Sequence, residues 1–266
     1  MDYDLKKRYG EKVDRIALDG GMTCPNRDGT IGSGGCIFCS ANGSGDFAGS
    51  ASCSVSEQLA HGKQLLKSKR PVHAYIAYFQ AFTNTYAPVE YLEKIYMQAV
   101  SDPDVRILSI ATRPDCLDED ILALLERINR IKPVWVELGL QTIHADTAAY
   151  IRRGYELPVF ERAVNDLRAR GIEVIVHTIL CLPGETKPVS YTHLFFFCQF
   201  THLLIGFFFQ HHKTVFHILL TLFIFFVRLH DRSQITLLFH QSSETFCIIC
   251  HIRFLKFAHD FFVSNQ

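Results

Sequence analysis

An alternation of short β-branched runs with amphipathic segments constrains the fold of the first 187 residues most strongly. Five runs rich in valine, isoleucine and aromatic residues are predicted to be buried strands. They span residues 13–18, 72–79, 105–111, 134–140 and 173–180. This alternation predicts an α/β fold with a parallel sheet, either a barrel or an open doubly wound sheet.

The helices between these strands are predicted from apolar residues at positions i, i+3, i+4 and i+7. Helix ends are marked as well: Ser54 and Glu57 form a capping-box pattern, and Asp118 is a candidate N-cap. Gly171 is placed to end the last helix. The three apolar sets are Leu92, Ile95, Tyr96 and Ala99; Ile121, Leu124, Leu125 and Ile128; and Phe160, Ala163, Val164 and Leu167.

The composition changes near Pro188. Residues 189–266 contain 17 of the 22 phenylalanines and 9 of the 13 histidines, but 3 of the 27 acidic residues and no proline. A folded segment of this length needs turn residues and a charged face. We therefore expect residues 1–187 to form a core domain, and residues 188–266 to be a spurious or disordered apolar tail produced by a frameshift or chimera.

A membrane anchor is the alternative interpretation of this tail. Residues 215–227 are strongly apolar, but the run is shorter than the ~20 residues of a spanning helix and it contains His217. We therefore expect no membrane association. The segment from Cys247 to His251 has zinc-ligand spacing, but a motif inside this tail is discounted.

Charge and cysteine content restrict the function and the location. The 27 basic and 27 acidic residues balance, which excludes the global basic excess of a protein that binds nucleic acid mainly through phosphates. The charged N-terminus, with Lys6 and Lys7, is unlike a secretory signal. The cysteine count of nine is odd, with close pairs that are typical of metal sites. We expect a cytoplasmic protein.

Three cysteines lie on one glycine-rich segment directly after the first predicted strand. They are Cys24, Cys36 and Cys39, in the pattern Cys-x11-Cys-x2-Cys. Thiolates are preferred ligands of zinc and of iron–sulfur clusters. A structural zinc site needs a fourth ligand, for which Cys53 is the candidate, whereas three cysteines suit a four-iron cluster with one open iron. The pattern favours the iron–sulfur cluster.

This cysteine segment, with the aromatic Phe38 before its last cysteine, resembles the cluster loop of the radical S-adenosylmethionine (SAM) superfamily. The commonest spacing in that superfamily has three residues in the first gap. The longer gap resembles the Elongator-catalytic-subunit-like branch and the YhcC-like proteins. Residues 18–29, 78–86 and 112–115 are most similar to the YhcC-like proteins, and the resemblance extends from residue 1 to about residue 187.

The resemblance implies a fold and two cofactors. The implied fold is a partial (β/α)6 radical SAM barrel that lacks its sixth unit and is followed by the non-native Phe-rich tail. The cofactors are a [4Fe-4S] cluster, bound by Cys24, Cys36 and Cys39, and SAM. The implied reaction is the reductive cleavage of SAM to a 5′-deoxyadenosyl radical that acts on an unknown substrate, with an electron donor such as flavodoxin or ferredoxin.

The resemblance also implies which residues contact SAM. In the segment from Glu137 to Thr142, Gln141 matches a SAM-contacting glutamine, and Arg153, twelve residues later, matches an arginine that binds the SAM carboxylate. His177 matches a ribose contact. The other expected members of this site, near the adenine and along the cavity wall, are Phe38, Gln80 and Thr112.

Two further expectations concern the substrate and whether the chain is catalytically active. Likeness to the Elongator branch suggests transfer RNA as the substrate, which a small patch of basic residues would bind through its phosphates. The patch residues are Lys6, Lys7, Arg8, Lys12 and Arg15.

The alternative function is an iron–sulfur or zinc binding module with a structural or electron-transfer role. A barrel without its sixth unit has an unpaired edge, so we expect a truncated and inactive enzyme.

Overall fold

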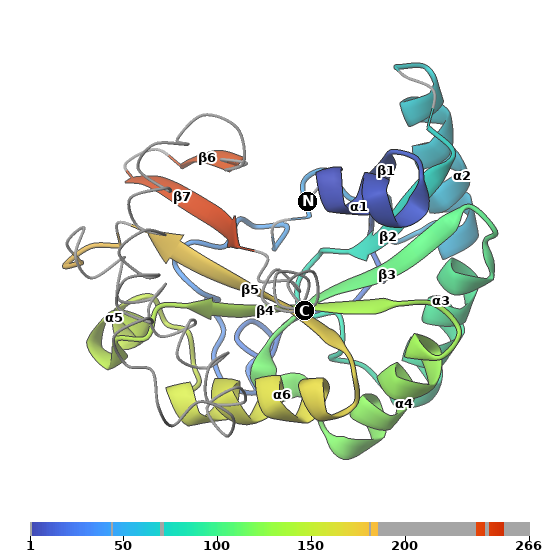
Figure 1. The fold of residues 1–266 in the computed structure, drawn as a ribbon. Helices are drawn as coiled ribbons and strands as arrows, with labels where there is room; N and C mark the ends of the chain where they lie inside the picture. The colour runs from blue at the N-terminus through green and yellow to red at the C-terminus, as the bar shows by residue number, and fades with distance from the viewer. Residues whose placement is uncertain are drawn as a thin grey trace, which may run out of the picture. The chain divides into compact units, whose positions relative to one another are not determined.

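The computed structural model describes residues 2–43, 45–69, 72–180 and 182–185, together with the backbone of residues 238–242 and 245–252. Five strands lie in the order β1-β2-β3-β4-β5. The pairings of β1 with β2, β2 with β3 and β3 with β4 are all parallel (Figure 1). The strands are β1 (Val13–Leu18), β2 (Ala74–Phe79), β3 (Val105–Thr112), β4 (Val134–Gln141) and β5 (Glu173–Leu180).

The strand order decides between the two predicted architectures. Each strand lies beside the one that precedes it in the chain, without the reversal that defines a doubly wound sheet. The fold is therefore a partial parallel α/β barrel, as expected. All five predicted strands are present, with bounds within two residues of the prediction.

The helices cover this sheet with the predicted apolar stripes. All twelve residues of the three stripes are buried. Figure 1 shows α2, α3, α4 and α6 along one face of the sheet. The sequence did not predict α1 or α5. The helices are α1 (Asp2–Tyr9), α2 (Val55–Lys67), α3 (Val89–Ser101), α4 (Glu119–Asn129), α5 (Ala145–Tyr150) and α6 (Leu157–Ala169), with a 3-10 turn, η1 (Pro114–Cys116).

The predicted helix ends are confirmed. Ser54 Oγ accepts from the backbone N–H of Glu57 at 3.3 Å, while Glu57 Oε2 accepts from the N–H of Ser54 at 2.7 Å. Asp118 Oδ1 accepts from the N–H of Ile121 at 2.9 Å. Gly171, after α6, has a φ of +69°, which glycine adopts without the steric cost of a side chain.

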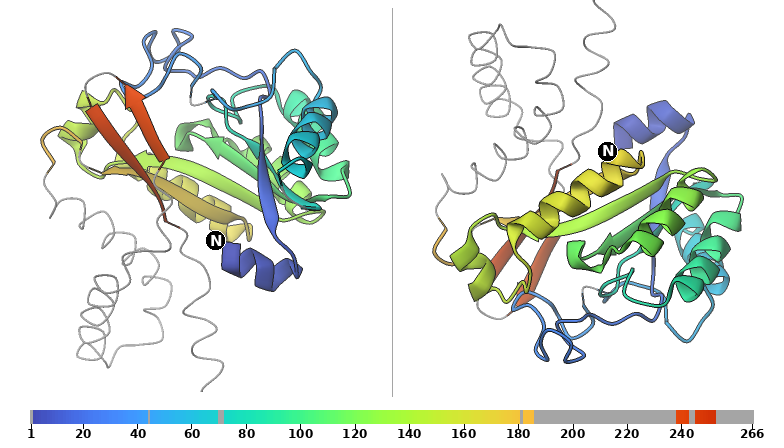
Figure 2. Two further views of the ribbon diagram at one scale, coloured as in Figure 1. Left: turned by 90° about the horizontal axis from the view of Figure 1, so that it is seen from above. Right: turned by 90° about the horizontal axis from the view of Figure 1, so that it is seen from below.

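The other face of the sheet holds an apolar core that α1 completes. Leu5 of α1 is 1% exposed and belongs to the same cluster as residues from all five strands. Figure 2 shows α1 at one end of the strands and the long loop after β1 at the other end. Helix α1 therefore covers the amino-terminal end of this core. The cluster contains Leu5, Val13, Ala74, Ile76, Tyr78, Ile107, Trp135 and Ile175.

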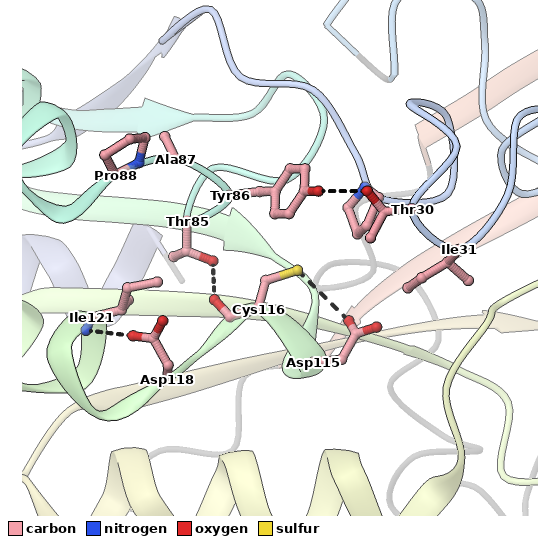
Figure 3. Close-up of a pocket in the computed structure, with 11 residues that line it drawn as sticks. Thr30, Ile31, Thr85, Tyr86, Ala87, Pro88, Asp115, Cys116, Asp118 and Ile121 are labelled. Carbon is pink, nitrogen blue, oxygen red and sulfur yellow. Dashed lines mark hydrogen bonds between the residues drawn. The ribbon is translucent and has the colours of Figure 1, made fainter.

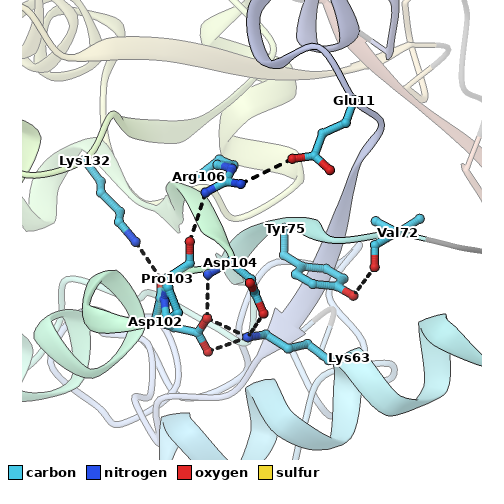
Figure 4. Close-up of polar contacts among 9 residues, drawn as sticks. All are labelled: Glu11, Lys63, Val72, Tyr75, Asp102, Pro103, Asp104, Arg106 and Lys132. Atoms are coloured by element: carbon cyan, nitrogen blue, oxygen red, sulfur yellow. Dashed lines mark hydrogen bonds and ion pairs between the residues drawn. The ribbon is translucent and has the colours of Figure 1, made fainter.

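A network of ion pairs holds the amino-terminal edge of the sheet (Figure 4). Lys63 Nζ of α2 lies 2.5 Å from Asp102 Oδ1 and 2.8 Å from Asp104 Oδ2, just before β3. Arg106 Nη2 lies 3.2 Å from Glu11 Oε1 at the start of β1. The network joins α2 and the beginnings of two strands, on the edge opposite the carboxyl ends.

The structure also describes one hairpin in the C-terminal segment. Strands β6 (Leu238–Ser242) and β7 (Thr245–Ile252) pair antiparallel. The sequence did not predict this element in a segment expected to be spurious or disordered. Residues 186–237 and 253–266 lie outside the described residues, so the tail interpretation stays a prediction. Among the helices that the structure describes, none combines the length and apolar character of a membrane span.

Candidate functional site

The cysteine segment forms a loop at the carboxyl end of β1. Cys24, Cys36 and Cys39 are all half-buried. The carbonyls of Cys24 and Cys36 accept turn hydrogen bonds, the latter from the N–H of Cys39 at 3.1 Å. Gly35 has a φ of +70°, and a Cβ atom there would lie 2.9 Å from Arg27 Nε. A glycine is therefore favoured where the loop turns into its second cysteine.

The thiols of Cys36 and Cys39 form a hydrogen-bonded pair that favours one thiolate. The hydrogen bond from Cys39 lowers the pKa of Cys36 to about 6, although burial opposes this change. The pKa of Cys36 is lowered further by a hydrogen bond from Asn26 and by the charges of Arg113 and Arg27. The bond to Cys36, together with burial, raises the pKa of Cys39. A thiolate, rather than a thiol, is the form that binds a metal.

The three thiols do not converge on one point that could hold a single metal ion. Among the described residues, no group of three or more His, Cys, Asp or Glu side chains lies close enough to hold one metal ion. The charge of Cys24 contributes to raising the pKa of Cys39. A cluster binds each cysteine through a different iron and therefore accepts ligands that lie further apart. Cys53 is exposed.

Asn26 attaches the cysteine loop to a segment that lies far away in the sequence. Its side chain is buried, and Nδ2 donates to the carbonyl of Arg152 at 2.6 Å. The same Nδ2 lies 3.4 Å from Cys36 Sγ, and the N–H of Ile37 donates to the carbonyl of Ile151 at 3.2 Å. Sequence reasoning used Asn26 only as part of a motif and did not predict this role.

Arg113 is a second buried residue that sequence reasoning did not assign to the site. Its guanidinium binds Asp115 through two hydrogen bonds, of 2.9 and 2.6 Å, and donates to the carbonyl of Arg153 at 2.8 Å. The Asp115 hydrogen bonds raise the pKa of Arg113 even though burial acts to lower it, so this side chain stays cationic. It supplies positive charge beside the thiols.

Arg153, expected to bind the SAM carboxylate, contacts backbone carbonyls in this structure. It is 3% exposed, and Nη1 donates to Leu140 O at 2.9 Å and to Thr142 O at 2.5 Å. Its Nε donates to Tyr155 O at 3.0 Å. Burial lowers the pKa of Arg153. Arg153 thus holds the end of β4, and its contact with SAM stays a prediction.

Gln141, the expected SAM-contacting glutamine, ends β4 in an unusual conformation. Its φ is +65°, a left-handed value that is uncommon for residues other than glycine and is often found at functional sites. A Cβ atom on Gly139 would lie 2.7 Å from Gln141 Nε2. The amide therefore occupies the space that a side chain at position 139 would need.

Three further residues that are expected to contact SAM lie at the same carboxyl edge of the sheet. Thr112, at the end of β3, is buried with its Oγ1 atom 2.5 Å from Thr85 Oγ1. Gln80, directly after β2, is half-buried and donates its N–H to Leu18 O at 3.3 Å. Phe38 is half-buried beside Cys39. Their contacts with SAM stay predictions.

His177 is held by a residue that sequence reasoning did not assign. Its Nε2 atom lies 2.8 Å from Oε2 of Glu137, whose side chain is fully buried. Arg15 also binds this carboxylate, with Nη2 2.9 Å from Oε1. The prediction that Arg15 belongs to a surface phosphate patch was wrong, because Arg15 occupies an inward position of β1.

A cavity of about 590 Å³ borders the cysteine loop without containing the three cysteines (Figure 3). The hydroxyls of Thr30 and Tyr86 lie 3.0 Å apart in its wall. Burial, with the nearby charge of Asp115, raises the pKa of Cys116 there to about 12. None of the expected SAM contacts lines this cavity. Its wall comprises Pro25, Thr30, Ile31, Thr85, Tyr86, Ala87, Pro88, Asp115, Cys116, Asp118 and Ile121.

Comparison with known sequences identifies a family and several relatives. Residues 27–188 match the family model described as the radical SAM superfamily. An uncharacterized protein, YtqA of Bacillus subtilis, is 48% identical over 189 residues, which are 71% of this chain and 59% of that protein. Protein YhcC of Escherichia coli is 46% identical over 184 residues, 68% of this chain and 58% of that protein. The chain thus spans less than two thirds of these relatives' length.

Solved structures show more distant similarity. Elp3 of the archaeon Methanocaldococcus infernus is 18% identical, with a TM-score of 0.48 over 68% of this chain and 41% of that chain. Coproporphyrinogen III oxidase (HemN) of Escherichia coli, a radical SAM enzyme, is 15% identical, with a TM-score of 0.47 over 73% of this chain and 43% of that chain.

Proposed function

Because the chain belongs to the radical SAM superfamily, we propose that Cys24, Cys36 and Cys39 bind a [4Fe-4S] cluster and that this core cleaves SAM reductively. The observation that supports the proposal most directly is the cysteine loop itself. It presents three half-buried thiols at the carboxyl edge of a parallel sheet, and one of them favours the thiolate form. That edge is where α/β folds bind their ligands.

The residues of the chain have separable roles in this proposal. When bound, a reduced cluster supplies the electron that breaks a carbon–sulfur bond of SAM, which yields methionine and a 5′-deoxyadenosyl radical. The cysteines hold the iron, while Asn26 fixes the loop that carries them. Arg113 supplies positive charge beside the thiolates. Gln141 and His177 orient SAM.

The proposal is tested by anaerobic reconstitution of the full chain with iron and sulfide. We expect about four irons per chain and an electron paramagnetic resonance signal that changes on addition of SAM. Cys36→Ala should lose the iron, whereas the matched variant Cys53→Ala should retain it, because Cys53 lies outside the proposed ligand set. SAM-dependent formation of 5′-deoxyadenosine then tests the reaction.

A metal-binding module without SAM chemistry is the alternative. One tightly bound zinc ion per chain, with no iron after reconstitution, would support that alternative and contradict the cluster. An iron cluster whose spectrum does not respond to SAM would leave a structural or electron-transfer role.

The electron donor and the substrate are further parts of the proposal. A small electron carrier such as flavodoxin or ferredoxin is proposed as the donor. Transfer RNA is proposed as the substrate on the resemblance to the Elongator branch. Lys6, Lys7 and Arg8 lie in the last turn of α1, at the opposite end of the strands from the cysteine loop (Figure 2). RNA bound at α1 would therefore have to extend around the core to reach the cluster.

A further inference from the structure

Asn26 lies in the long first gap of the cysteine loop and braces that loop at two points. Its carbonyl oxygen accepts from the N–H of Gly35 at 2.8 Å, directly before the second cysteine. Its side-chain Nδ2 lies 3.4 Å from the sulfur of Cys36. Asn26 is only 5% exposed, so this amide is held inside the protein. A residue two positions after the first cysteine therefore reaches the thiol of the second.

Two carbonyls of a distant segment fix the direction of the Asn26 amide. Nδ2 donates to Arg152 O at 2.6 Å and lies 3.5 Å from Arg153 O. A carbonyl oxygen can only accept, so the nitrogen end of the amide must face these carbonyls. A rotated amide would place its own oxygen against two other oxygens. The nitrogen end is therefore also the end that faces the sulfur of Cys36.

One of the two amide hydrogens is left for this sulfur. The carbonyl of Arg152 takes the first hydrogen, at 2.6 Å. The carbonyl of Arg153 is a weak competitor for the second, because 3.5 Å exceeds an ordinary N–H···O length and this carbonyl already accepts from Arg113 Nη1 at 2.8 Å. Asp115 holds the Arg113 guanidinium in place through two hydrogen bonds, of 2.9 and 2.6 Å. The second amide hydrogen is thus directed to Cys36.

The backbone N–H groups on either side of Cys36 bind elsewhere. That of Gly35 donates to the carbonyl of Asn26, and that of Ile37 donates to the carbonyl of the residue that caps α5, at 3.2 Å. The Cys36 thiol can donate to Arg152 O at 3.4 Å, but a thiolate that binds a metal has no hydrogen and can only accept. Within the described part of the chain, the Asn26 amide is therefore the N–H donor to a Cys36 thiolate.

We infer that Asn26 is a positioning residue whose amide donates a hydrogen bond to the Cys36 sulfur and thereby raises the reduction potential of the bound cluster. This role rests on the proposed function, because it requires the cluster. Reduction adds negative charge, part of which is carried by the cysteine sulfurs, so an N–H donor stabilises the reduced form more than the oxidised form. Asn26 does not bind iron and acts only through Cys36.

The midpoint potential of the reconstituted full chain, measured by a redox titration followed by electron paramagnetic resonance, tests this role. Asn26→Leu removes the donor at similar volume. The variant should have a more negative potential, equivalent to reduction about tenfold less favourable, or about 59 mV for one electron. Thr30→Val is the matched control, because it removes the 3.0 Å contact with Tyr86 from the same loop and keeps the amide, and its potential should equal that of the wild type.

An Asn26→Leu variant that binds about four irons and keeps the wild-type potential would exclude the role of Asn26 and leave the proposed function intact. Substitution also deprives the Arg152 carbonyl of its 2.6 Å donor. A measurement on the wild type is therefore needed in case the variant does not bind iron.

Pulsed electron paramagnetic resonance of the reduced wild type, labelled with ¹⁵N in the asparagine side chains, supplies that measurement. We expect a coupling to one ¹⁵N nucleus, because an N–H···S bond transfers spin density to the donor nitrogen. Asn42→Ser, which removes the other asparagine near the cysteines, should keep this coupling. A loaded wild type without the coupling contradicts the role of Asn26. A wild type that binds no iron contradicts the proposed function itself.

Discussion

At the scale of single residues, the end of β4 depends on the absence of one side chain. Gln141 adopts a left-handed backbone conformation, and its amide occupies the space beside Gly139. The two residues form one unit, because the glycine makes room for the amide that the proposed function assigns to SAM. A substitution at Gly139 should therefore affect ligand binding before it affects folding.

Gly139→Ala is predicted to weaken S-adenosylhomocysteine binding by roughly tenfold, about 1.4 kcal/mol, which is the upper range for one displaced hydrogen bond. The new Cβ atom would lie 2.7 Å from Gln141 Nε2, so the amide must move. Calorimetric titration of the reconstituted protein measures the change. In a Gln141→Ala background the same substitution should cost nothing further, and an undiminished cost there would show that the glycine acts independently of Gln141.

At the scale of elements, the Lys63 network joins α2 to the segment that begins β3. One ammonium group binds the carboxylates of Asp102 and Asp104. Removing this ammonium group leaves the two carboxylates close together before β3 with no positive charge between them. The network lies on the opposite edge from the cysteine loop, so its loss should change stability and leave iron binding unchanged.

Lys63→Met is predicted to lower the free energy of unfolding by about 1–2 kcal/mol, as for a partly buried charged hydrogen bond. Urea denaturation measures this change in the free energy of unfolding. Lys67→Met, on the exposed side of α2, is the control, and its free energy of unfolding should lie within about 0.5 kcal/mol of the wild-type value. The Lys63 hydrogen bond lowers the pKa of Asp104, so this stabilisation is present above the ordinary aspartate pKa. The difference between variant and wild type should therefore shrink as the pH falls below about 3.9.

At the scale of the whole molecule, the expected basic patch and the cysteine loop lie at opposite ends of the strands (Figure 2). If α1 binds RNA, the double variant Lys6→Glu, Lys7→Glu should weaken RNA binding and reduce the salt slope by about 1.4–1.8, the value for two phosphate contacts. Fluorescence anisotropy at several salt concentrations measures this. The iron content and the affinity for S-adenosylhomocysteine should not change, and a parallel loss of either would show that the substitutions act through the core and not through RNA contacts.

The sequence predicted the elements of this core better than the contacts of its site. Strands and helix stripes follow from periodicity, which is local, so their bounds and buried faces could be predicted. Helix α5, with six residues, is too short for a periodic pattern. The contact of Glu137 with Arg15 joins residues 122 positions apart, which only the register of the strands brings together. The contact of Asn26 with the carbonyl of Arg152 joins residues 126 positions apart and likewise has no local signal in the sequence.

The attachment of the cysteine loop has a consequence for the order of events during synthesis. The loop lies within the first 40 residues, but Asn26 and Ile37 bind the carbonyls of Arg152 and Ile151. A ribosome completes the three cysteines long before it supplies these carbonyls. Until then the loop lacks the two hydrogen bonds that attach its cysteines to this part of the core. Iron insertion should therefore follow the emergence of α5, so that the earliest cysteines of the chain are among the last residues of the core to reach their final state.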